Sequence, residues 1–533
     1  MSGRVDATAD AIEAGRAVLG IELGSTRIKA CLVGDDPSQV LATGSYEWEN
    51  QFVDGVWTYS LDDVWTGLRA AYADLMADVR RRFPVTPRSF AAIGISAMMH
   101  GYLAFDHAGE LLVPFRTWRN TTTATAAAEL THLFGVNIPL RWSIAHLHQA
   151  VPDAEPHVGD IRYLTTLAGY VHWRLTGERV LGVGDASGMF PIDSATKDYD
   201  AELLARYDKL VGGGPLAGPL RGLLPTVLPA GRLAGALTAA GAALLDPAGE
   251  LQPGVALAPP EGDAGTGMVA TNSVRPRTGN VSAGTSIFAM VVLERPLGQL
   301  HSEVDLVTTP VGDPVAMVHC NNGGSELAAW AGLFQRFAEA AATSLDADAV
   351  YDILFREALD GPADGGGLYA YNQLAGEPIA GVDEGRPLFV RTPESRLTLA
   401  GAMRAQLYGV FATLALGMRV LTDEGVALER MYAHGGLFRT AGVAQRLLAG
   451  ALDAPVSTAG TAGEGGAWGM AVLAGYTASG AGTDLGSYLS DRVFASTEFA
   501  TTEPDPGDVA GFAVYLDHYR SGLDIVRAAA IAL

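Results

Sequence analysis

The chain is poor in positive charge and in cysteine. Against 59 aspartates and glutamates it has 36 lysines and arginines, which gives a formal net charge of −23 over 533 residues. Because nucleic acids and anionic membranes are themselves negative, we expect so acidic a protein to bind neither. The two cysteines, Cys31 and Cys320, sit in apolar stretches typical of buried thiols, so we expect no disulfide scaffold.

Lysine is scarcer still, and its positions exclude several kinds of site. Lys29, Lys197 and Lys209 are the only lysines, and none of them follows a glycine. A P-loop ends in Gly-Lys-Ser or Gly-Lys-Thr, so this nucleotide-binding motif is absent. The sequence also has no Cys-x-x-Cys, no His-Glu-x-x-His and no Gly-x-Ser-x-Gly motif. A bound phosphate must therefore be held by backbone, hydroxyl groups and metal.

Neither a leader sequence nor a membrane span is predicted. The stretch from Met1 to Val18 carries acids where a signal peptide has an apolar core. Leu397 to Leu421 is apolar, but Arg404, Arg419 and the helical period of the apolar residues predict a packed helix. We expect a cytoplasmic protein, and its length predicts two or three domains.

Two segments of the sequence share a glycine turn between short apolar strands. The first runs from Val18 to Val33 and the second from Gly279 to Val292. Such corners predict β-hairpins, and their N–H and hydroxyl groups can converge on one phosphate oxygen. We therefore expect two half-domains that hold one polyphosphate from opposite sides. At a fixed offset, the matching residues are Gly24, Ser25, Thr26 and Ile28 in the first copy and Gly284, Thr285, Ser286 and Phe288 in the second.

The two copies differ at one acidic position. Glu22 stands in the first strand where the second copy has Ser282. A carboxylate beside a phosphate site is usually explained by a magnesium ion, so we predict that Glu22 binds Mg²⁺ or its water ligands. The alternative is a buried strand carboxylate that neighbouring amides hold, because a charge there is costly without a partner.

The order of predicted elements repeats in the two halves. Three strands, a helix and further strands open the first half, and a hairpin, a long helix and a strand–glycine–helix unit make up the second. This is the pattern of a ribonuclease-H-like duplication. The predicted ranges are strands at 17–23, 27–33, 40–48, 90–96 and 102–105, a helix at 61–81 with Ser60 as N-cap, an irregular Gly/Pro/Ala-rich connection at 211–262, a hairpin at 279–292, a helix at 396–421 and the final unit at 431–452.

Several ordered motifs resemble one family, the FGGY carbohydrate kinases of the sugar kinase, heat-shock chaperone and actin superfamily. The resemblance implies an α/β fold of two ribonuclease-H-like (actin-like ATPase) domains with the active site in the cleft between them. It divides the chain into an extension at 1–16, an N-terminal domain at 17–273 and a C-terminal domain at 274–533. The motifs are Gly20–Thr26 and Gly284–Ser286 for phosphate, Ile95–Gly101, Thr117–Asn120 and Asp185–Asp193 for sugar, Gly262–Ala264 for the catalytic aspartate, and His434–Gly436 with Glu464–Gly469 for nucleotide.

Asp263 is the predicted catalytic residue. Phosphoryl transfer to an alcohol requires a base for the hydroxyl proton, and Asp263 follows Gly262 where the two halves of the sequence meet. The alternative is an aspartate that only caps a loop, which is the commoner role of Gly-Asp in isolation.

The sugar-binding residues implied by the resemblance lie in three of the motifs. His100 follows a predicted strand at the edge where open α/β sheets hold ligands, although it could be only a hydrogen-bonded loop residue. Trp118 could stack on a sugar face or belong to the core. The family commonly has Trp followed by Asp and then Arg, whereas here Asn120 and Thr122 stand at those places. The full set is Met99, His100, Trp118, Arg119, Asn120, Asp185 and Asp263.

Gly435 and Gly436 are predicted to bind nucleotide. They end an apolar strand and precede a helix, where bare backbone admits a nucleotide and the helix N-terminus favours phosphate. Such glycine pairs are usually simple turns, and only their place after two hairpins favours the nucleotide role.

The resemblance implies an ATP- and Mg²⁺-dependent kinase. The predicted substrate is a ketopentose, L-ribulose or D-xylulose, phosphorylated at its terminal hydroxyl, because the motifs look closest to pentulose kinases (xylulokinase and L-ribulokinase). Alternatives are another polyol or sugar kinase of the family, a non-catalytic ATP-driven module and a sugar sensor. A homodimer stays open.

Overall fold

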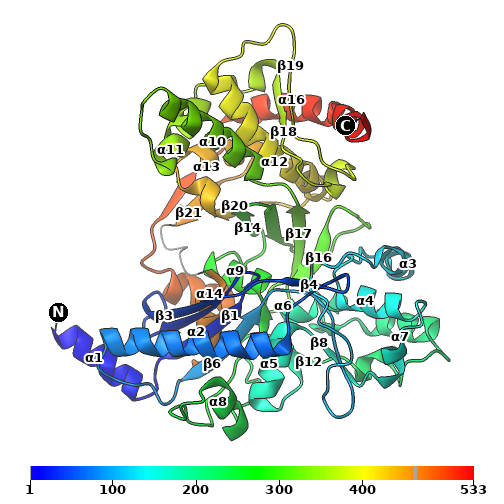
Figure 1. Ribbon diagram of the computed structural model, residues 1–533, viewed down its shortest axis with the longest axis vertical. Helices are drawn as coiled ribbons and strands as arrows, with labels where there is room; N and C mark the ends of the chain where they lie inside the picture. The colour runs from blue at the N-terminus through cyan, green and yellow to red at the C-terminus, as the bar shows by residue number, and fades with distance from the viewer. Residues whose placement is uncertain (1, 460–464, 533) are drawn as a thin grey trace. The chain divides into compact units, whose positions relative to one another are not determined.

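The computed structural model describes residues 2–459 and 465–532, with side chains from residue 7 onward, and the chain divides into two compact units (Figure 1). Unit 1 comprises Met1–Val274, Leu306–Val315 and Thr461–Ser496, and unit 2 comprises Arg275–Asp305, Ala316–Gly460 and Thr497–Leu533. The first boundary falls one residue after the end expected for the N-terminal domain. Unit 1 also includes two segments from later in the chain, so the two units are not divided at a single point in the sequence as the prediction assumed.

Unit 1 is built on a five-stranded sheet in the order β13-β6-β1-β2-β3. The first three strands along the chain form an antiparallel meander, and β6 and β13 join it in parallel. β6 is buried along its whole length, as an interior strand covered on both faces must be. The strands are β1 (Val18–Leu23), β2 (Arg27–Val33), β3 (Val40–Glu47), β6 (Ala92–Ala97) and β13 (Glu261–Gly262).

The remaining elements of unit 1 are helices and two-stranded sheets. In α2, Ser60 caps the N-terminus by accepting the Asp63 N–H at 3.0 Å, which confirms the predicted cap. The helices are α1 (Ser2–Glu13), α2 (Leu61–Arg82), α3 (Ala124–Phe134), α4 (Ser143–Ala150), α5 (Leu167–Thr176), α6 (Val183–Ala186), α7 (Ala201–Leu210), α8 (Ala239–Leu245), α9 (Asp263–Ala270), α14 (Gly465–Ala478) and α15 (Leu485–Tyr488). The small sheets pair β4 (Gln51–Val53) with β5 (Val56–Thr58), β7 (Leu103–Phe105) with β8 (Tyr163–Thr165), β9 (Val180–Gly182) with β12 (Thr226–Leu228), and β10 (Ile192–Asp193) with β11 (Asp198–Tyr199).

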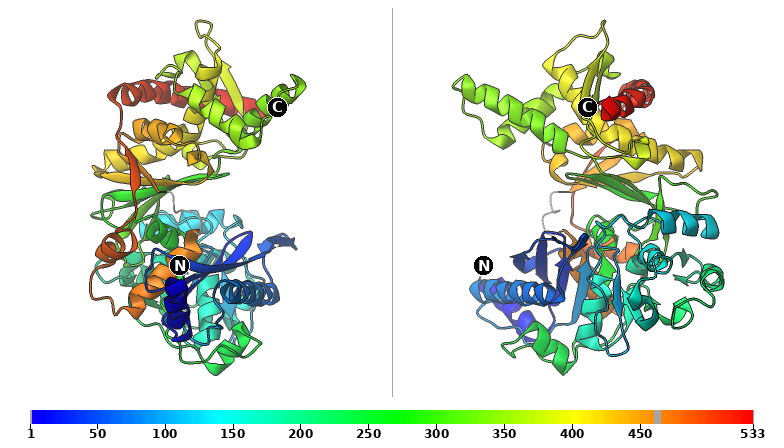
Figure 2. Two further views of the ribbon diagram at one scale, coloured as in Figure 1. Left: turned by 90° about the vertical axis from the view of Figure 1, so that its left-hand side faces the viewer. Right: turned by 45° about the vertical axis from the view of Figure 1, so that its right-hand side comes forward.

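Helix α14 comes late in the chain but packs on the first strands of unit 1. Figure 2 shows it in orange beside the blue strands. A Cβ added at Gly20 of β1 would overlap the backbone of Ala467 and Ala471, and one at Gly469 would overlap the Thr266 carbonyl group of α9. Glycine is needed at these positions because two backbones approach closely.

Unit 2 repeats the central strand order of unit 1. Its seven-stranded sheet has the order β16-β17-β15-β14-β20-β21-β22, in which β14 is antiparallel to β15 and parallel to β20. The expected duplication is therefore present. The strands are β14 (Thr278–Ala283), β15 (Ile287–Val292), β16 (Asp305–Thr308), β17 (Pro314–Cys320), β20 (Arg430–His434), β21 (Val456–Ala459) and β22 (Phe499–Thr502), with a separate pair of β18 (Leu368–Tyr371) and β19 (Leu388–Arg391). The helices are α10 (Ser325–Ala340), α11 (Ala347–Ala358), α12 (Leu399–Asp423), α13 (Val443–Leu452), α16 (Pro506–Ser521) and α17 (Leu523–Ala532).

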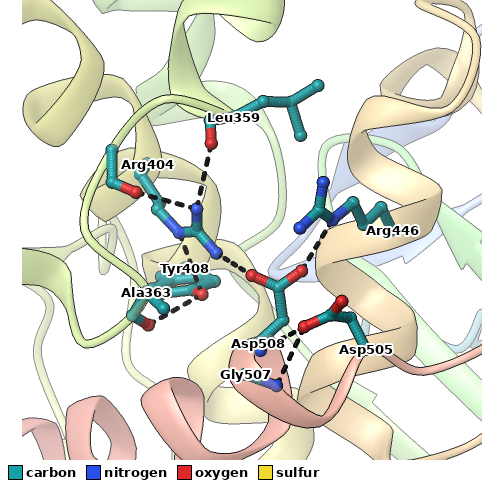
Figure 3. A network of polar contacts seen from close by, with 9 residues as sticks. Leu359, Ala363, Arg404, Tyr408, Arg446, Asp505, Gly507 and Asp508 are labelled. Carbon is teal, nitrogen blue, oxygen red and sulfur yellow. Dashed lines mark hydrogen bonds and ion pairs between the residues drawn. The ribbon is translucent and has the colours of Figure 1, made fainter.

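Helix α12 is long and apolar enough to cross a membrane by length and composition, and it is the one such helix in the part of the chain that the structure describes. Most of its apolar window, 83%, is buried inside the protein. It also carries Arg404, which pairs with the buried Asp508 of α16 (Figure 3). These contacts agree with the predicted packed helix.

The buried charge of α12 belongs to a network that joins three helices. Asp508 accepts from Arg404 of α12 and, at 2.6 Å, from Arg446 of α13 (Figure 3). The Arg404 guanidinium also donates to the Tyr408 hydroxyl at 3.0 Å and to the Gly361 carbonyl at 2.9 Å. Arg404 and Asp508 are each less than 5% exposed, so each is the counter-charge that makes burial of the other tolerable.

The two hairpins differ in the length of their turns. Leu23 pairs with Ile28 in the first, whereas Ala283 pairs with Ile287 in the second, so the second turn is one residue shorter. The match of Ile28 with Phe288 at a fixed offset is therefore wrong by one residue. Ile287 takes the place of Ile28, and both are buried.

The two cysteines are as the sequence predicts. Cys31 lies on β2 and Cys320 at the end of β17, and both are buried. Neither forms a disulfide in the described residues.

Candidate active site

The turn of the first hairpin is held by aromatic side chains. The Trp48 indole N–H donates to the Gly24 carbonyl at 2.7 Å, and the Tyr59 hydroxyl donates to the Ser25 carbonyl at 2.6 Å. The Trp118 indole N–H donates to the Ser25 hydroxyl at 3.3 Å. Trp118, a predicted sugar residue, thus lies beside a predicted phosphate residue, and it is 37% exposed.

Glu22 lies on β1 between two polar neighbours. Lys29 is its cross-strand partner on β2, and Ser96 lies opposite it on β6. Burial and the charge of Asp263 raise the pKa of Glu22 to about 7, against the effect of Lys29 and of a hydrogen bond from the Ala467 N–H. The hydrogen bond from the Ala467 N–H is what we expect if Glu22 is only a buried structural carboxylate. The nearby charge of Asp263 is what we expect if Glu22 belongs to the active site.

Asp263 is the first residue of α9. Its Oδ1 accepts the Met99 N–H at 3.0 Å, so the predicted base and the Met-His-Gly segment are in contact. Burial raises the pKa of Asp263, although hydrogen bonds from the backbone N–H groups of Met99, Ala264 and Asp263 itself oppose the shift. A carboxylate whose pKa moves upward toward neutral pH is a better proton acceptor.

The Met-His-Gly segment has a strained backbone. His100 has φ 73° and Gly101 has φ 103°, and only glycine adopts such values freely. His100 is buried, its Nδ1 lies 3.4 Å from the Gly188 carbonyl, and its ring stacks on Trp142. The contact with Gly188 joins this segment to the motif that begins at Asp185.

Asp185 brings a second carboxyl group to the same place. Its Oδ2 accepts the Thr166 hydroxyl at 2.6 Å, while its Oδ1 is buried without a partner among the described residues. Burial raises the pKa of Asp185 to about 7, and the charge of Asp263 adds to the shift. The structure therefore gathers Met99, Asp185 and Asp263 in unit 1.

Arg119 and Asn120 have partners within the protein. The Arg119 guanidinium lies 3.7 Å from the centre of the Trp57 ring. The Asn120 amide accepts the Trp57 N–H at 2.9 Å and donates to the carbonyls of Trp57 and Thr117. Asn120 is buried and its donors are both used, so its contacts as described are structural.

Four residues of this site were not predicted from the sequence. One is the acidic residue Glu261, and the other three contact Glu22 or the turn of the first hairpin. Glu261 is 1% exposed and accepts N–H groups of α6, and only its position two residues before Asp263 could have drawn attention to it. The other missed residues are Lys29, Trp48 and Tyr59.

Glycine backbone, in place of aromatic rings, supports the second hairpin. The Gly323 N–H donates to the Thr285 carbonyl at 2.7 Å, and the Gly324 N–H donates to the Gly284 carbonyl at 2.8 Å. Gly435 has φ 108°, and a Cβ added there would overlap the Ala283 carbonyl group. The predicted Gly435 is thus required for close packing against the hairpin.

A pocket of about 860 Å³ adjoins the second hairpin within unit 2. Of the predicted residues, Gly284, Thr285 and Gly436 line it, whereas Ser286 and Gly435 do not. Tyr351 and Phe355 of α11 give it an aromatic wall, and the start of α10 at Ser325 places a helix N-terminus at its edge. A flat heterocycle and an anion suit these surfaces. Glu464 of the predicted nucleotide motif lies outside the described residues.

The described residues contain no group of three His, Cys, Asp or Glu side chains that could hold a metal ion. Mg²⁺ commonly keeps several waters and takes one or two carboxylates together with substrate phosphates. Glu22, a half-buried residue two positions before Gly24, fits that donor set.

The duplicated strand order and the paired glycine turns define a two-domain α/β protein of the ribonuclease-H-like type. Two family models match it in sequence: the N-terminal domain of the FGGY family of carbohydrate kinases at residues 17–248, and the C-terminal domain of the same family at 279–478. The chain belongs to the FGGY family of carbohydrate kinases.

Relatives in sequence are distant. A glycerol kinase of Thermococcus kodakarensis is 24% identical over 210 residues, and a xylulose kinase of Streptomyces coelicolor is 27% identical over 211. Each match spans 36% of this chain and only 40% of the relative.

Solved structures match over nearly the whole chain. A xylulose kinase of Rhodospirillum rubrum has a TM-score of 0.77 at 23% identity, covering 96% of this chain and 99% of that one. A gluconate kinase of Lactobacillus acidophilus has a TM-score of 0.76 at 17% identity, covering 97% and 99%. At such identities the likeness establishes the two-domain fold.

Proposed function

We propose that the protein is an ATP-dependent kinase that phosphorylates the terminal hydroxyl of a ketopentose. The observation that carries the proposal is the contact of Asp263 with the Met99 N–H in a site that also contains Asp185. Membership of the FGGY family supports it, because carbohydrate kinases transfer phosphate to a hydroxyl group of a carbohydrate.

Asp263 is the general base in this proposal. Phosphoryl transfer needs the acceptor hydroxyl to lose its proton as the new bond forms. Asp263 accepts that proton, and burial favours the protonated product by raising the pKa of its carboxyl group. The hydrogen bond from the Met99 N–H orients the carboxylate.

The glycine turns hold the phosphates of ATP. Gly24, Ser25 and Thr26 supply N–H and hydroxyl groups from the first hairpin, and Gly284, Thr285 and Ser286 supply them from the second. The pocket beside Tyr351 and Phe355 takes the purine ring, and Gly436 lies at its lining.

Glu22 would hold Mg²⁺ or its water ligands beside the first turn. When bound, the metal neutralises phosphate charge during transfer. Lys29 opposite Glu22 balances the carboxylate when the metal is absent, and the Ala467 N–H fixes the direction of the side chain.

D-Xylulose is the first substrate to test and L-ribulose the second. The solved xylulose kinase structures and the distant xylulose kinase in sequence support this order. Glycerol and gluconate kinases also match, so glycerol and gluconate belong in the same panel. Free sugar and ATP meet in the cytoplasm, where we propose that the protein acts.

A coupled assay of ADP release with each compound of this panel tests the proposal. Release of ADP that depends on one ketopentose, with a matching sugar phosphate by mass spectrometry, supports it. ADP release without any sugar dependence favours a non-catalytic or ATP-driven module. Binding of a sugar by calorimetry without turnover favours a sensor. If only glycerol or gluconate is phosphorylated, the proposed substrate is wrong but the proposed kinase activity is supported.

A further inference from the structure

Glu261 is a buried carboxyl group beside the candidate active site, and none of the roles above uses it. It lies on β13, two residues before Asp263. Burial and the charge of Asp185 raise the pKa of Glu261 to about 8. A carboxyl group so little exposed to solvent needs hydrogen-bond partners within the protein.

Both oxygens of Glu261 accept hydrogen bonds from the first turn of α6. Oε2 accepts the Asp185 N–H at 3.0 Å, and Oε1 accepts the Gly184 N–H at 3.3 Å. N–H groups at a helix start have no partner within the helix. Because α6 has only 4 residues, its own hydrogen bonds cannot fix its direction. The Glu261 carboxyl group therefore helps to hold the backbone of Asp185 in place. It does so together with the Thr308 hydroxyl, which donates to the Val183 carbonyl of the same helix at 3.0 Å.

The surrounding backbone leaves room for this carboxyl group and for little else. A Cβ added at Gly182 or at Gly184 would overlap a carboxyl oxygen of Glu261, and one at Gly265 would lie 3.3 Å from Oε2. Gly182 has φ −65°, which any residue adopts, so its missing side chain provides space rather than conformational freedom.

Asp185 is thereby held at two points, one on its side chain and one on its backbone. The Thr166 hydroxyl binds Oδ2, and Glu261 binds the backbone N–H. The remaining oxygen, Oδ1, is buried without a described partner, and a Cβ added at Gly262 would lie 3.2 Å from it. The same Cβ would lie 2.9 Å from Cγ of Met99. Oδ1 thus lies at the corner where Asp263 accepts the Met99 N–H.

We propose that Glu261 is a positioning residue for sugar binding, which fixes the backbone of Asp185 so that its bare carboxyl oxygen accepts a substrate hydroxyl. The assignment of that oxygen to substrate rests on the sugar kinase function proposed above. An unsatisfied buried acceptor costs free energy, and a donating sugar hydroxyl recovers that cost. Displacement of Asp185 loses this gain without touching the nucleotide.

The variant Glu261→Gln tests the proposal with the fold kept intact. A neutral amide keeps the volume but presents an NH₂ donor to one of the two N–H groups, so one hydrogen bond is lost. We expect the KM for sugar to rise by about tenfold or more, and the KM for ATP to change by less than about twofold. The matched control is Asp246→Asn, because Asp246 is another buried acid of unit 1 that accepts backbone N–H groups. Its sugar KM stays at the wild-type value.

A double-mutant cycle shows whether Glu261 acts through Asp185. In the Asp185→Asn background, Glu261→Gln then changes the sugar KM by less than about twofold. An equal effect in both backgrounds overturns the proposal. So does a wild-type sugar KM in the single variant Glu261→Gln.

Amide hydrogen exchange measures the positioning without any substrate. Exchange at Gly184 and Asp185 becomes faster in Glu261→Gln if the side chain holds them, and unchanged exchange overturns the proposal whatever the substrate. If the wild-type protein phosphorylates no compound of the panel, the proposed function fails. The exchange data then decide separately on the placement of Asp185.

Discussion

The two glycine hairpins have the same place in their sheets but different chemistry around them. In the first, Glu22 lies opposite Lys29, and at the equivalent place in the second, Ser282 lies opposite Phe288. An acid–base pair in unit 1 is thus replaced by a neutral pair in unit 2. The two hairpins share their strand pairing, but only the first copy carries charge at this pair of positions.

The segments beside the hairpins differ in the same way. In unit 1, Met99 and His100 follow β6, the strand next to the hairpin, and they contact Asp263 and Gly188. In unit 2, Gly435 and Gly436 follow the corresponding strand, β20, and present backbone alone. Side chains can read the hydroxyl pattern of a sugar, whereas bare backbone admits a phosphate chain closely. This difference supports the proposal that unit 1 supplies the sugar-binding and acid–base residues, and that the pocket of unit 2 takes the purine ring.

The largest effect on stability is expected from the buried charges of unit 2, which support its helices and not its hairpin. Asp508→Asn leaves Arg404 buried without its counter-charge and should lower the free energy of unfolding by about 3–5 kcal/mol. Denaturant unfolding measures this loss. As a control, Asp505→Ala removes the cap of α16 but leaves the pair of Arg404 and Asp508 in place, and it should cost about 1 kcal/mol. Equal losses would show that the network is not a special source of stability.

Substitutions at two neighbouring glycines test whether the second hairpin binds ATP. Gly435→Ala forces a side chain into the Ala283 carbonyl group at a positive φ, at a cost of about 1–3 kcal/mol. We expect weaker ATP binding by calorimetry as the hairpin shifts. Gly436→Ala meets nothing within 4 Å and should leave the fold unchanged. Similar ATP affinity and stability in both variants would contradict the close packing described for Gly435.

A pair of substitutions at equivalent strand positions tests the difference between the hairpins directly. Glu22→Gln should raise the magnesium concentration for half-maximal rate by roughly tenfold, because a neutral amide is a poor metal ligand. Ser282→Ala should leave it unchanged. Magnesium titration of the turnover rate measures both. An unchanged magnesium dependence with a lower melting temperature in Glu22→Gln would support the structural alternative, in which Glu22 serves the Ala467 N–H.

A smaller effect is expected from pH. Burial raises the pKa of Glu22 and Asp185 to about 7 and that of Glu261 to about 8, from ordinary values near 4. A folded protein that binds these protons more tightly is most stable below the ordinary pKa and loses stability as pH rises through the raised values. The melting temperature should therefore fall between pH 5 and pH 8. The decline should be shallower in Glu261→Gln, and an equal slope would contradict the raised pKa of Glu261.

Much of the fold could be predicted because local sequence patterns determine it. The turn residues mark both hairpins, Ser60 with two following aspartates marks the start of α2, and the apolar period marks α12. The FGGY motifs then give the duplication. The candidate residues Met99, Asp185 and Asp263 could be found in the same way, because each lies in a short motif.

Other features depend on contacts between distant parts of the chain. The role proposed for Glu261 depends on its contact with Gly184, which lies 77 residues earlier in the sequence. No local sequence pattern marks a single buried glutamate. Helix α14 joins unit 1 because Gly20 admits its backbone, which no local pattern near residue 465 shows. The second hairpin has a turn one residue shorter than the first, which shifts the strand position of Phe288. A comparison of the two sequences at a fixed offset cannot detect this shift.

The measurement that tests the account most directly compares ligand binding with turnover in Asp263→Asn. An isosteric amide keeps the contact with the Met99 N–H in reach but cannot take a proton. We expect the Kd values for sugar and for a non-hydrolysable ATP analogue to stay within about threefold of wild type, while kcat falls by roughly 10²–10⁴-fold. Near wild-type turnover with the correct sugar would show that Asp263 is not the base, and that the acid–base chemistry is not where this account places it.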